Sequence, residues 1–183
     1  MSNLEKIKDL SWQDIFDIWR KSEEPLEHWQ KLWKEKGFTS WEAWRKATHA
    51  NLRGQELSWA LCKVKNPVEE IPNWRGGMFH AWAKWFYPVL PEQPPRLKDL
   101  VAHPGVSNHW YVREILNNFP GQTTIIAVRL KNGDIVVVEG MHRCCSIALA
   151  AHNQTPLKSN ITVAVADWPF DDPPRLGLGW SNK

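Results

Sequence analysis

Five consecutive residues, Glu139-Gly140-Met141-His142-Arg143, combine side chains that can bind phosphate and move protons. They follow four apolar residues, Ile135 to Val138, and precede a stretch with helical periodicity, which predicts a turn between a buried strand and a helix. The first turn of a helix offers unpaired N–H groups and a partial positive charge. Gly140 has no Cβ, so the backbone can turn sharply and approach a ligand. The segment is therefore predicted to bind the phosphate groups of a ligand.

Two cationic residue types, His142 and Arg143, open the predicted helix. Cations are usually unfavourable at a helix N-terminus because the helix dipole repels them, so a bound anion would explain their presence. The alternative is that Arg143 pairs with Glu139 or another acid, while His142 caps the helix at the surface. Ion pairs also occupy such positions, and the spacing favours neither interpretation over the other.

The sequence before and after this turn predicts the helices and strands that would position it. Asn132-Gly133 is a strong signal for a two-residue hairpin loop. The preceding helix has its apolar face at Val112, Ile115 and Phe119, with Ser107 or Asn108 as the cap. The predicted elements are a helix at about 108–119, strands at 123–130 and 134–139, a helix at 141–152 and a strand at 161–166.

The first half of the chain is rich in tryptophan: ten of the 13 tryptophans lie between Trp12 and Trp85. Amphipathic helices are predicted to begin at Ser11, at Pro25 and near Ser40, and Arg75-Gly76-Gly77 is predicted to open another. These tryptophans are predicted to fill a helical core, the alternative being an aromatic surface for a ligand or partner protein.

The predicted fold class is α+β, with three regions along the chain. Residues 1–90 form a Trp-rich helical region, 96–167 a small α/β domain and 168–183 a loop-like tail. The proline-rich segment Pro88 to Pro95 marks the boundary between the first two.

Bulk properties narrow the functional classes. The net charge of +3 accommodates an anionic ligand without predicting nucleic-acid binding. The three cysteines, two of them adjacent, predict neither a disulfide framework nor a zinc site. No signal peptide and no segment of transmembrane length is found, so we expect a cytoplasmic protein that does not bind membranes.

The segment Ile125 to Leu149, IIAVRLKNGDIVVVEGMHRCCSIAL, resembles the ParB/sulfiredoxin superfamily. Members share a hairpin strand that ends in an acidic residue or glycine, followed by Gly-x-His-Arg at the start of a helix. The resemblance covers about residues 96 to 167 and implies a ParB/sulfiredoxin-like fold for that region. The Trp-rich half resembles no family.

The resemblance implies a nucleotide site at this turn. Gly140, His142 and Arg143 would hold nucleotide phosphates, with Met141 and Cys144 as backbone N–H donors. The implied cofactors are ATP or ADP with Mg²⁺, and the implied activity is phosphoryl transfer to an unknown small-molecule or protein acceptor, or hydrolysis.

Free-serine kinases of the superfamily place an acid just before the glycine, where Glu139 stands. It would hold Mg²⁺ or accept a hydroxyl proton. A second acid on the preceding helix would correspond to Glu114, for which a solvated surface position is the alternative.

The sequence departs from the superfamily at two points. Sulfiredoxins carry a reactive cysteine where this chain has Met141, and a thioether cannot act as a nucleophile. Cys144 is a candidate displaced nucleophile, although packing is favoured for it. The residues after the motif also lack the helical periodicity of a ParB DNA-binding domain.

Two other functional classes remain open. One is a nucleic-acid-binding protein or ParB-like nuclease, in which Trp110 stacks on bases beside a basic face. That face would consist of Arg96, Lys98, Arg113, Arg129 and Lys131. The other is an interaction module that has lost its chemistry.

Overall fold

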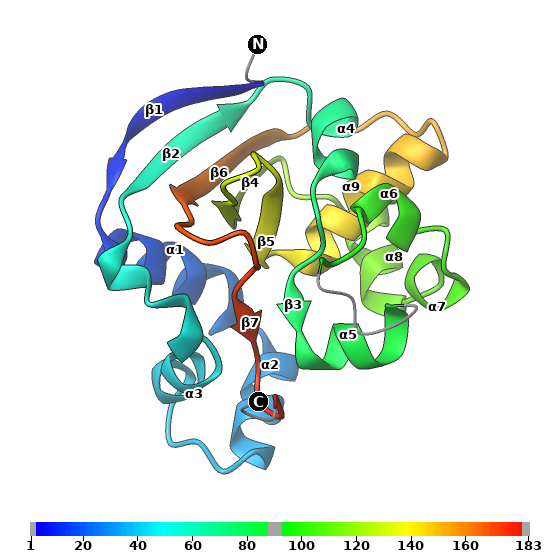
Figure 1. Cartoon of the computed structure of the whole chain (residues 1–183). Helices are drawn as coiled ribbons and strands as arrows, with labels where there is room; N and C mark the ends of the chain where they lie inside the picture. The colour runs from blue at the N-terminus through cyan, green and yellow to red at the C-terminus, as the bar shows by residue number, and fades with distance from the viewer. Residues whose placement is uncertain (1–2, 88–92, 181–183) are drawn as a thin grey trace.

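A five-stranded mixed sheet organises the chain (Figure 1). The computed structural model describes residues 3–87 and 93–180. The strand order is β1-β2-β6-β4-β5; β4 and β6 are parallel and the other neighbours are antiparallel. The strands are β1 (Leu4–Leu10), β2 (Trp59–Val64), β4 (Gln122–Arg129), β5 (Ile135–Glu139) and β6 (Asn160–Asp167). A separate parallel pair joins β3 (Met78–Phe79) to β7 (Arg175–Leu176).

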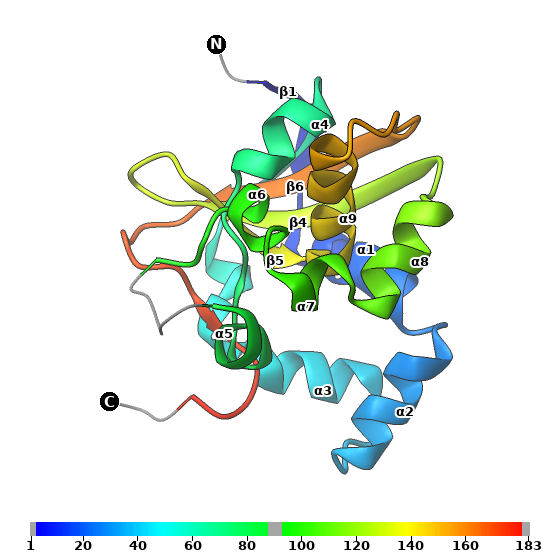
Figure 2. The same ribbon diagram turned by 90° about the vertical axis from the view of Figure 1, so that its right-hand side faces the viewer.

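Helices cover both faces of the sheet (Figure 2). On one face lie α4 (Pro67–Glu70), α6 (Leu97–Leu100), α7 (Pro104–Ser107), α8 (Trp110–Asn117) and α9 (Met141–His152), with the 3-10 turn η3 (Ile71–Asn73). Toward the other face lie α1 (Trp12–Glu23), α2 (Glu27–Glu35) and α3 (Trp41–Thr48), followed by the 3-10 turns η1 (Ala50–Leu52) and η2 (Gly54–Glu56). Helix α5 (His80–Phe86) follows β3. In the part of the chain described, no helix is both long and apolar enough to cross a membrane.

Strand β5 is buried on both faces, as its apolar run predicts. Ile135 and Val137 pack into the core beneath α9, whereas Val136 and Val138 pack into the core shared with α1 and α3. Side chains alternate between the two faces of a strand, so each residue of the run serves one of the two cores. The strand thereby carries Glu139 to a position between the two helical layers.

The coarse α+β class is confirmed, but the description of residues 1–90 as helical is incomplete. The segment Ser58 to Val64, whose pattern is ambiguous between strand and helix, forms β2. Strands β1 and β2 belong to that half, and β2 pairs with β6 from the second half, with Trp59 opposite Ala166. The charged strand β1 is exposed along much of its length, so it lacks the apolar alternation that would have identified it. Of the expected boundary at Pro88 to Pro95, residues 88–92 lie outside the described part of the chain.

Several local predictions are confirmed. Ser11 caps α1 in a reciprocal capping box with Asp14, and the helix 141–152 has the predicted bounds. The hairpin between β4 and β5 forms, and Gly133 adopts φ +88° in its loop, a conformation that glycine tolerates best. The loop is longer than the predicted two residues, because the Leu130 N–H bonds to the Asp134 carbonyl and leaves residues 131–133 between them. Most of the expected C-terminal tail lacks regular structure in its described part, 168–180, although β7 lies within it.

Three predicted helix starts are wrong. Helix α8 is capped by the His109 side chain, two residues from the earlier candidate cap Ser107 and adjacent to Asn108. Helix α2 begins at Glu27 rather than at Pro25. The segment after Arg75 is extended because Arg75 hydrogen-bonds to β5, so α5 begins only at His80.

Candidate functional site

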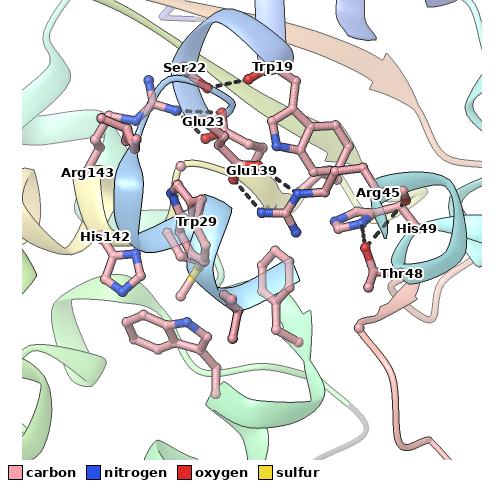
Figure 3. A pocket seen from close by; sticks show the side chains of 18 of the residues that line it. Trp19, Ser22, Glu23, Trp29, Arg45, Thr48, His49, Glu139, His142 and Arg143 are labelled. Carbon is pink, nitrogen blue, oxygen red and sulfur yellow. Dashed lines mark hydrogen bonds and ion pairs between the residues drawn. The ribbon is translucent and has the colours of Figure 1, made fainter. Parts of the chain in front are cut away.

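A cavity of about 660 Å³ lies between the β5–α9 turn and the Trp-rich helices (Figure 3). Residues of the predicted turn, Glu139 to Arg143, line it from the sheet side. Helices α1, α2, α3 and α5 supply much of the opposite wall, including Trp19, Trp29, Trp44 and Trp82. Its volume falls in the range typical of small-molecule sites, about 300–1,000 Å³.

The turn has the backbone geometry predicted for it. Gly140 adopts φ +97° and precedes α9, which begins without a side-chain cap. The first backbone hydrogen bond of the helix runs from the Cys144 N–H to the Gly140 carbonyl at 2.9 Å. The N–H groups of residues 141 to 143 therefore have no backbone acceptor within the described chain. Cys144 is wrong as a backbone donor to phosphate, because its N–H is already used.

Glu139 and Arg143 form a buried ion pair. The Arg143 Nη2 atom donates to both carboxylate oxygens of Glu139 at 2.5 Å, and the two side chains are 15% and 7% exposed. Arg143 Nη1 donates to the Thr123 hydroxyl and to the Thr124 carbonyl. The guanidinium is thus anchored to β4 and β5. The alternative in which Arg143 pairs with Glu139 is the arrangement present.

This pairing changes what the two residues can do. Burial raises the pKa of the Glu139 carboxyl above its usual range, while the Arg143 cation opposes that rise. A carboxyl in a cavity with a raised pKa is a candidate proton acceptor or donor. Arg143 has little freedom to clamp a phosphate with two parallel bonds, so its predicted clamping role would require the pair to open.

His142 lies in the cavity wall and is not a surface cap. Its ring centroid is 5.0 Å from that of Tyr111, 5.1 Å from that of His109 and 5.3 Å from that of Trp82. Burial, together with the nearby His109, His28 and Arg143, lowers the pKa of His142 to about 3. The imidazole is therefore neutral at pH 7 and acts as a hydrogen-bonding group rather than as a cation.

The remaining candidates separate into packed and exposed residues. Met141 is buried, and its sulfur accepts a hydrogen bond from the Gly77 N–H at 3.1 Å. Cys144 is fully buried, and burial raises its thiol pKa, which confirms packing over a nucleophilic role. Glu114 is exposed on α8 and does not line the cavity, in agreement with the surface alternative.

A second buried ion pair, which sequence reasoning missed, lines the same cavity. Glu23 at the end of α1 accepts from Arg45 of α3, with Nε and Nη2 at 2.7 and 2.6 Å from separate carboxylate oxygens. The two side chains are 8% and 9% exposed. Trp41 Nε1 also donates to Glu23, at 3.0 Å. Each pair is neutral overall, so the cavity carries balanced charges within an apolar wall.

Three tryptophans surround the Arg45 guanidinium. Its central carbon lies 3.7 Å from the ring centroid of Trp44, 5.0 Å from that of Trp19 and 5.4 Å from that of Trp29. Such cation–π contacts hold the cation in place. The sequence signal was available: Arg45 follows Trp41 by four residues, which places a charge on the apolar face of α3. The tryptophans therefore serve both as core and as the wall of the cavity.

Two of the five cations of the proposed basic face are paired with acids. Arg96 pairs with Asp134 at 3.1 Å, and Arg129 pairs with Asp167 at 2.9 Å. The Arg113 guanidinium donates to the Ser107 carbonyl oxygen. Trp110 is exposed, but the arrangement of charges around it gives the nucleic-acid alternative no added support.

Comparison with known protein families, with curated proteins and with solved structures finds no match for this chain.

Proposed function

We propose that this protein binds a nucleotide, with its phosphates at the Gly140–Arg143 turn and its base among the tryptophans. The observation that carries this proposal is that the uncapped start of a 12-residue helix opens into a large aromatic cavity. Helix N-termini bind phosphate through backbone N–H groups, and aromatic rings stack on bases. A nucleotide combines both groups in one ligand. The ATP or ADP implied by the resemblance is one such ligand.

A magnesium ion would arrive with the nucleotide, and the ion pair between Glu139 and Arg143 would have to open to admit it. Among the described residues, no group of three or more His, Cys, Asp or Glu side chains is arranged to hold a metal. Mg²⁺ commonly binds through one or two carboxylates together with substrate phosphates and water. Glu139 is the residue that would hold it, and the ion would neutralise phosphate charge.

The binding proposal is tested by placing a negative charge at the turn. His142→Asp introduces a carboxylate beside the proposed phosphate position. His142→Asn introduces a side chain of nearly the same shape as Asp but without the charge. We expect Asp to weaken the binding of ADP, GDP and UDP by at least about tenfold through charge repulsion, and Asn to weaken it only a few-fold. The measurement is titration calorimetry with Mg²⁺ present.

Thermal unfolding of each variant provides the control for folding, because a carboxylate at the partly buried position 142 carries a desolvation cost that the favourable helix dipole offsets only in part. Equal affinities in the Asp and Asn variants would show that phosphate does not sit at this turn. No binding to wild type by any of the nucleotides would overturn the proposed function.

As the alternative to holding Mg²⁺, we propose that Glu139 acts as the proton acceptor when phosphate is transferred to a hydroxyl group or to water, once its ion pair with Arg143 opens. Its carboxyl has a raised pKa and lines the cavity beside the turn. In hydrolysis, a water oxygen would bond to the terminal phosphorus, the bond to the bridging oxygen would break, and Glu139 would take the water proton.

Glu139→Gln should therefore retain nucleotide binding within a few-fold but reduce phosphate release by about 100-fold or more. Phosphate release is measured under single-turnover conditions for wild type and variant. Glu114→Gln, at an exposed position outside the cavity, is the matched control and should turn over like wild type. Undiminished turnover in Glu139→Gln would exclude this role.

A further inference from the structure

The ion pair between Glu23 and Arg45 leaves a donor group and an acceptor position unused. Arg45 donates to Glu23 from Nε and Nη2, and its Nη1 atom makes no hydrogen bond to any residue that the structure describes. The Glu23 carboxylate accepts two hydrogen bonds at Oε2, from Arg45 and Trp41, and one at Oε1, from Arg45. A carboxylate has about four acceptor positions, so one position remains on Oε1.

This pair lines the cavity. The Arg45 side chain is 9% exposed and the Glu23 side chain is 8% exposed, and both residues belong to the cavity wall. Figure 3 shows the guanidinium projecting from α3 toward the middle of the cavity. The ring of Trp44, whose centroid is 3.7 Å from the guanidinium carbon, holds it in place. A ligand in the cavity therefore meets a donor that is fixed beside a carboxylate.

The charges of the pair favour a neutral ligand. Arg45 and Glu23 neutralise each other, and so do Arg143 and Glu139 in the same cavity. A charged group of a ligand would leave water without gaining a counter-charge of its own, which costs free energy. A hydroxyl group carries no charge and can both donate and accept. Two neighbouring hydroxyl groups can thus bind the pair, one accepting from Arg45 Nη1 and the other donating to Glu23 Oε1.

An aromatic ring lies next to the pair. Trp29 is half-buried in the cavity wall, and its ring centroid is 5.4 Å from the Arg45 guanidinium carbon. A sugar ring presents C–H groups on its face and hydroxyl groups around its rim, so it can pack on an indole while its rim makes hydrogen bonds. The nucleotide base has a separate aromatic wall, because the rings of Trp82 and His142 lie 5.3 Å apart.

The pair also lies close to Glu139, the proposed proton acceptor (Figure 3). Burial raises the pKa of Glu139 and Arg143 opposes that rise, while the Glu23 carboxylate raises this pKa and Arg45 lowers it. Charges act strongly on a carboxyl only over short distances, so the two ion pairs share one region of the cavity. A hydroxyl group bound at Arg45 and Glu23 is therefore placed near Glu139 and the phosphate turn.

We propose, building on the proposed phosphoryl transfer, that the acceptor is a neutral sugar or a related cyclic polyol bound by Arg45, Glu23 and Trp29. With a nucleoside triphosphate at the turn, a sugar oxygen bonds to the terminal phosphorus and the bond from that phosphorus to the bridging oxygen breaks. Glu139 takes the hydroxyl proton once its ion pair with Arg143 opens. The products are a sugar phosphate and a nucleoside diphosphate.

The first test measures sugar binding to the full chain without nucleotide, by nuclear magnetic resonance titration of the ligand signals. D-Glucose and D-galactose are each compared with the analogue that carries a carboxylate, D-glucuronate or D-galacturonate. We expect at least one neutral sugar to bind and its carboxylate analogue to bind at least about tenfold more weakly. Binding by neither neutral sugar, or equal binding by the carboxylate analogue, would overturn the inference.

Arg45→Lys tests the assignment to the ion pair. Lysine keeps a cation for Glu23 but offers no second fixed nitrogen to the ligand, so sugar affinity should fall by at least about tenfold. Arg20→Lys is the matched control and should bind like wild type, because Arg20 pairs with Glu42 outside the cavity lining. If thermal unfolding shows that Arg45→Lys does not fold, Trp29→Leu replaces it with the same expected loss. Wild-type affinity in the folded variant would overturn the assignment.

A second measurement separates this inference from the proposed function. With ATP or GTP and Mg²⁺, the sugar that binds should accelerate the formation of nucleoside diphosphate by at least about tenfold, because a positioned hydroxyl group replaces a mobile water. Nucleotide binding without this acceleration would overturn the sugar as acceptor and leave the proposed nucleotide site intact. Sugar binding without nucleotide binding would overturn the proposed function and the transfer step with it.

Discussion

Replacing Arg45 by alanine should destabilise the protein by about 3–5 kcal/mol, because it leaves the Glu23 carboxylate buried without its cationic partner. The Trp41 N–H still donates to Glu23, but one neutral hydrogen bond cannot replace a bidentate guanidinium. Packing against Trp19, Trp29 and Trp44 is lost as well. The measurement is urea unfolding at neutral pH, followed by tryptophan fluorescence.

Arg20 offers the matched control. It pairs with Glu42 at 2.9 Å, but these side chains are 35% and 43% exposed. Arg20→Ala should therefore cost only about 0–1 kcal/mol. The double variant Glu23→Leu/Arg45→Met, which replaces both charges with apolar groups of similar size, should be more stable than Arg45→Ala. If Arg45→Ala costs no more than Arg20→Ala, the pair does not carry the stability assigned to it.

Lowering the pH should begin to destabilise the protein below about pH 6.5, well above the pH at which most carboxylates titrate. The pKa of His142 is lowered to about 3 in the folded chain, and the pKa of His49 is also well below its usual 6.5. Because the unfolded chain binds these protons and the folded chain does not, stability is complete above about pH 6.5. It falls as the pH decreases toward 3, by about 1.4 kcal/mol per pH unit for His142, and His49 adds a loss in the same direction.

Urea unfolding at pH 7.5 and pH 5.0 measures this loss. His142→Asn removes one titrating group and should reduce the loss by about 2 kcal/mol. Glu139 opposes the effect, since its raised pKa lets the folded chain bind a proton earlier than the unfolded chain. His152→Asn, an exposed position at the other end of α9, is the control. An unchanged pH dependence in His142→Asn would show that His142 is not the group responsible.

The second half of the fold was predictable because its signals are local. The apolar run Ile135 to Val138, the Asn132-Gly133 loop and the break at Gly140 each specify structure within a few residues. Strand β1 could not be identified in this way. Its charged residues give no period-two pattern, and its place in the sheet comes from pairing with residues of β2 that lie 49 to 60 positions away in the sequence.

The candidate site was predicted in part. The turn was found because glycine, a buried strand and a helix start are adjacent in the sequence. Its opposite wall was missed, because Glu23 and Arg45 become partners only when α1 and α3 pack together. The aromatic and charged residues of that wall fit an amphipathic helix pattern equally well when they face a core or a cavity. Only the three-dimensional arrangement distinguishes the two.

The position of β6 in the sheet has a consequence for how the protein folds. Strand β6, at Asn160–Asp167, is inserted between β2 and β4, so the β1–β2 pair and the β4–β5 pair are joined in this sheet by the strand that comes last of the five in the sequence. During synthesis, both pairs must wait with one open edge until β6 emerges from the ribosome. Contacts between residues so distant in sequence form slowly, and open strand edges promote aggregation. The last of the five strands to be made thus determines when the sheet closes.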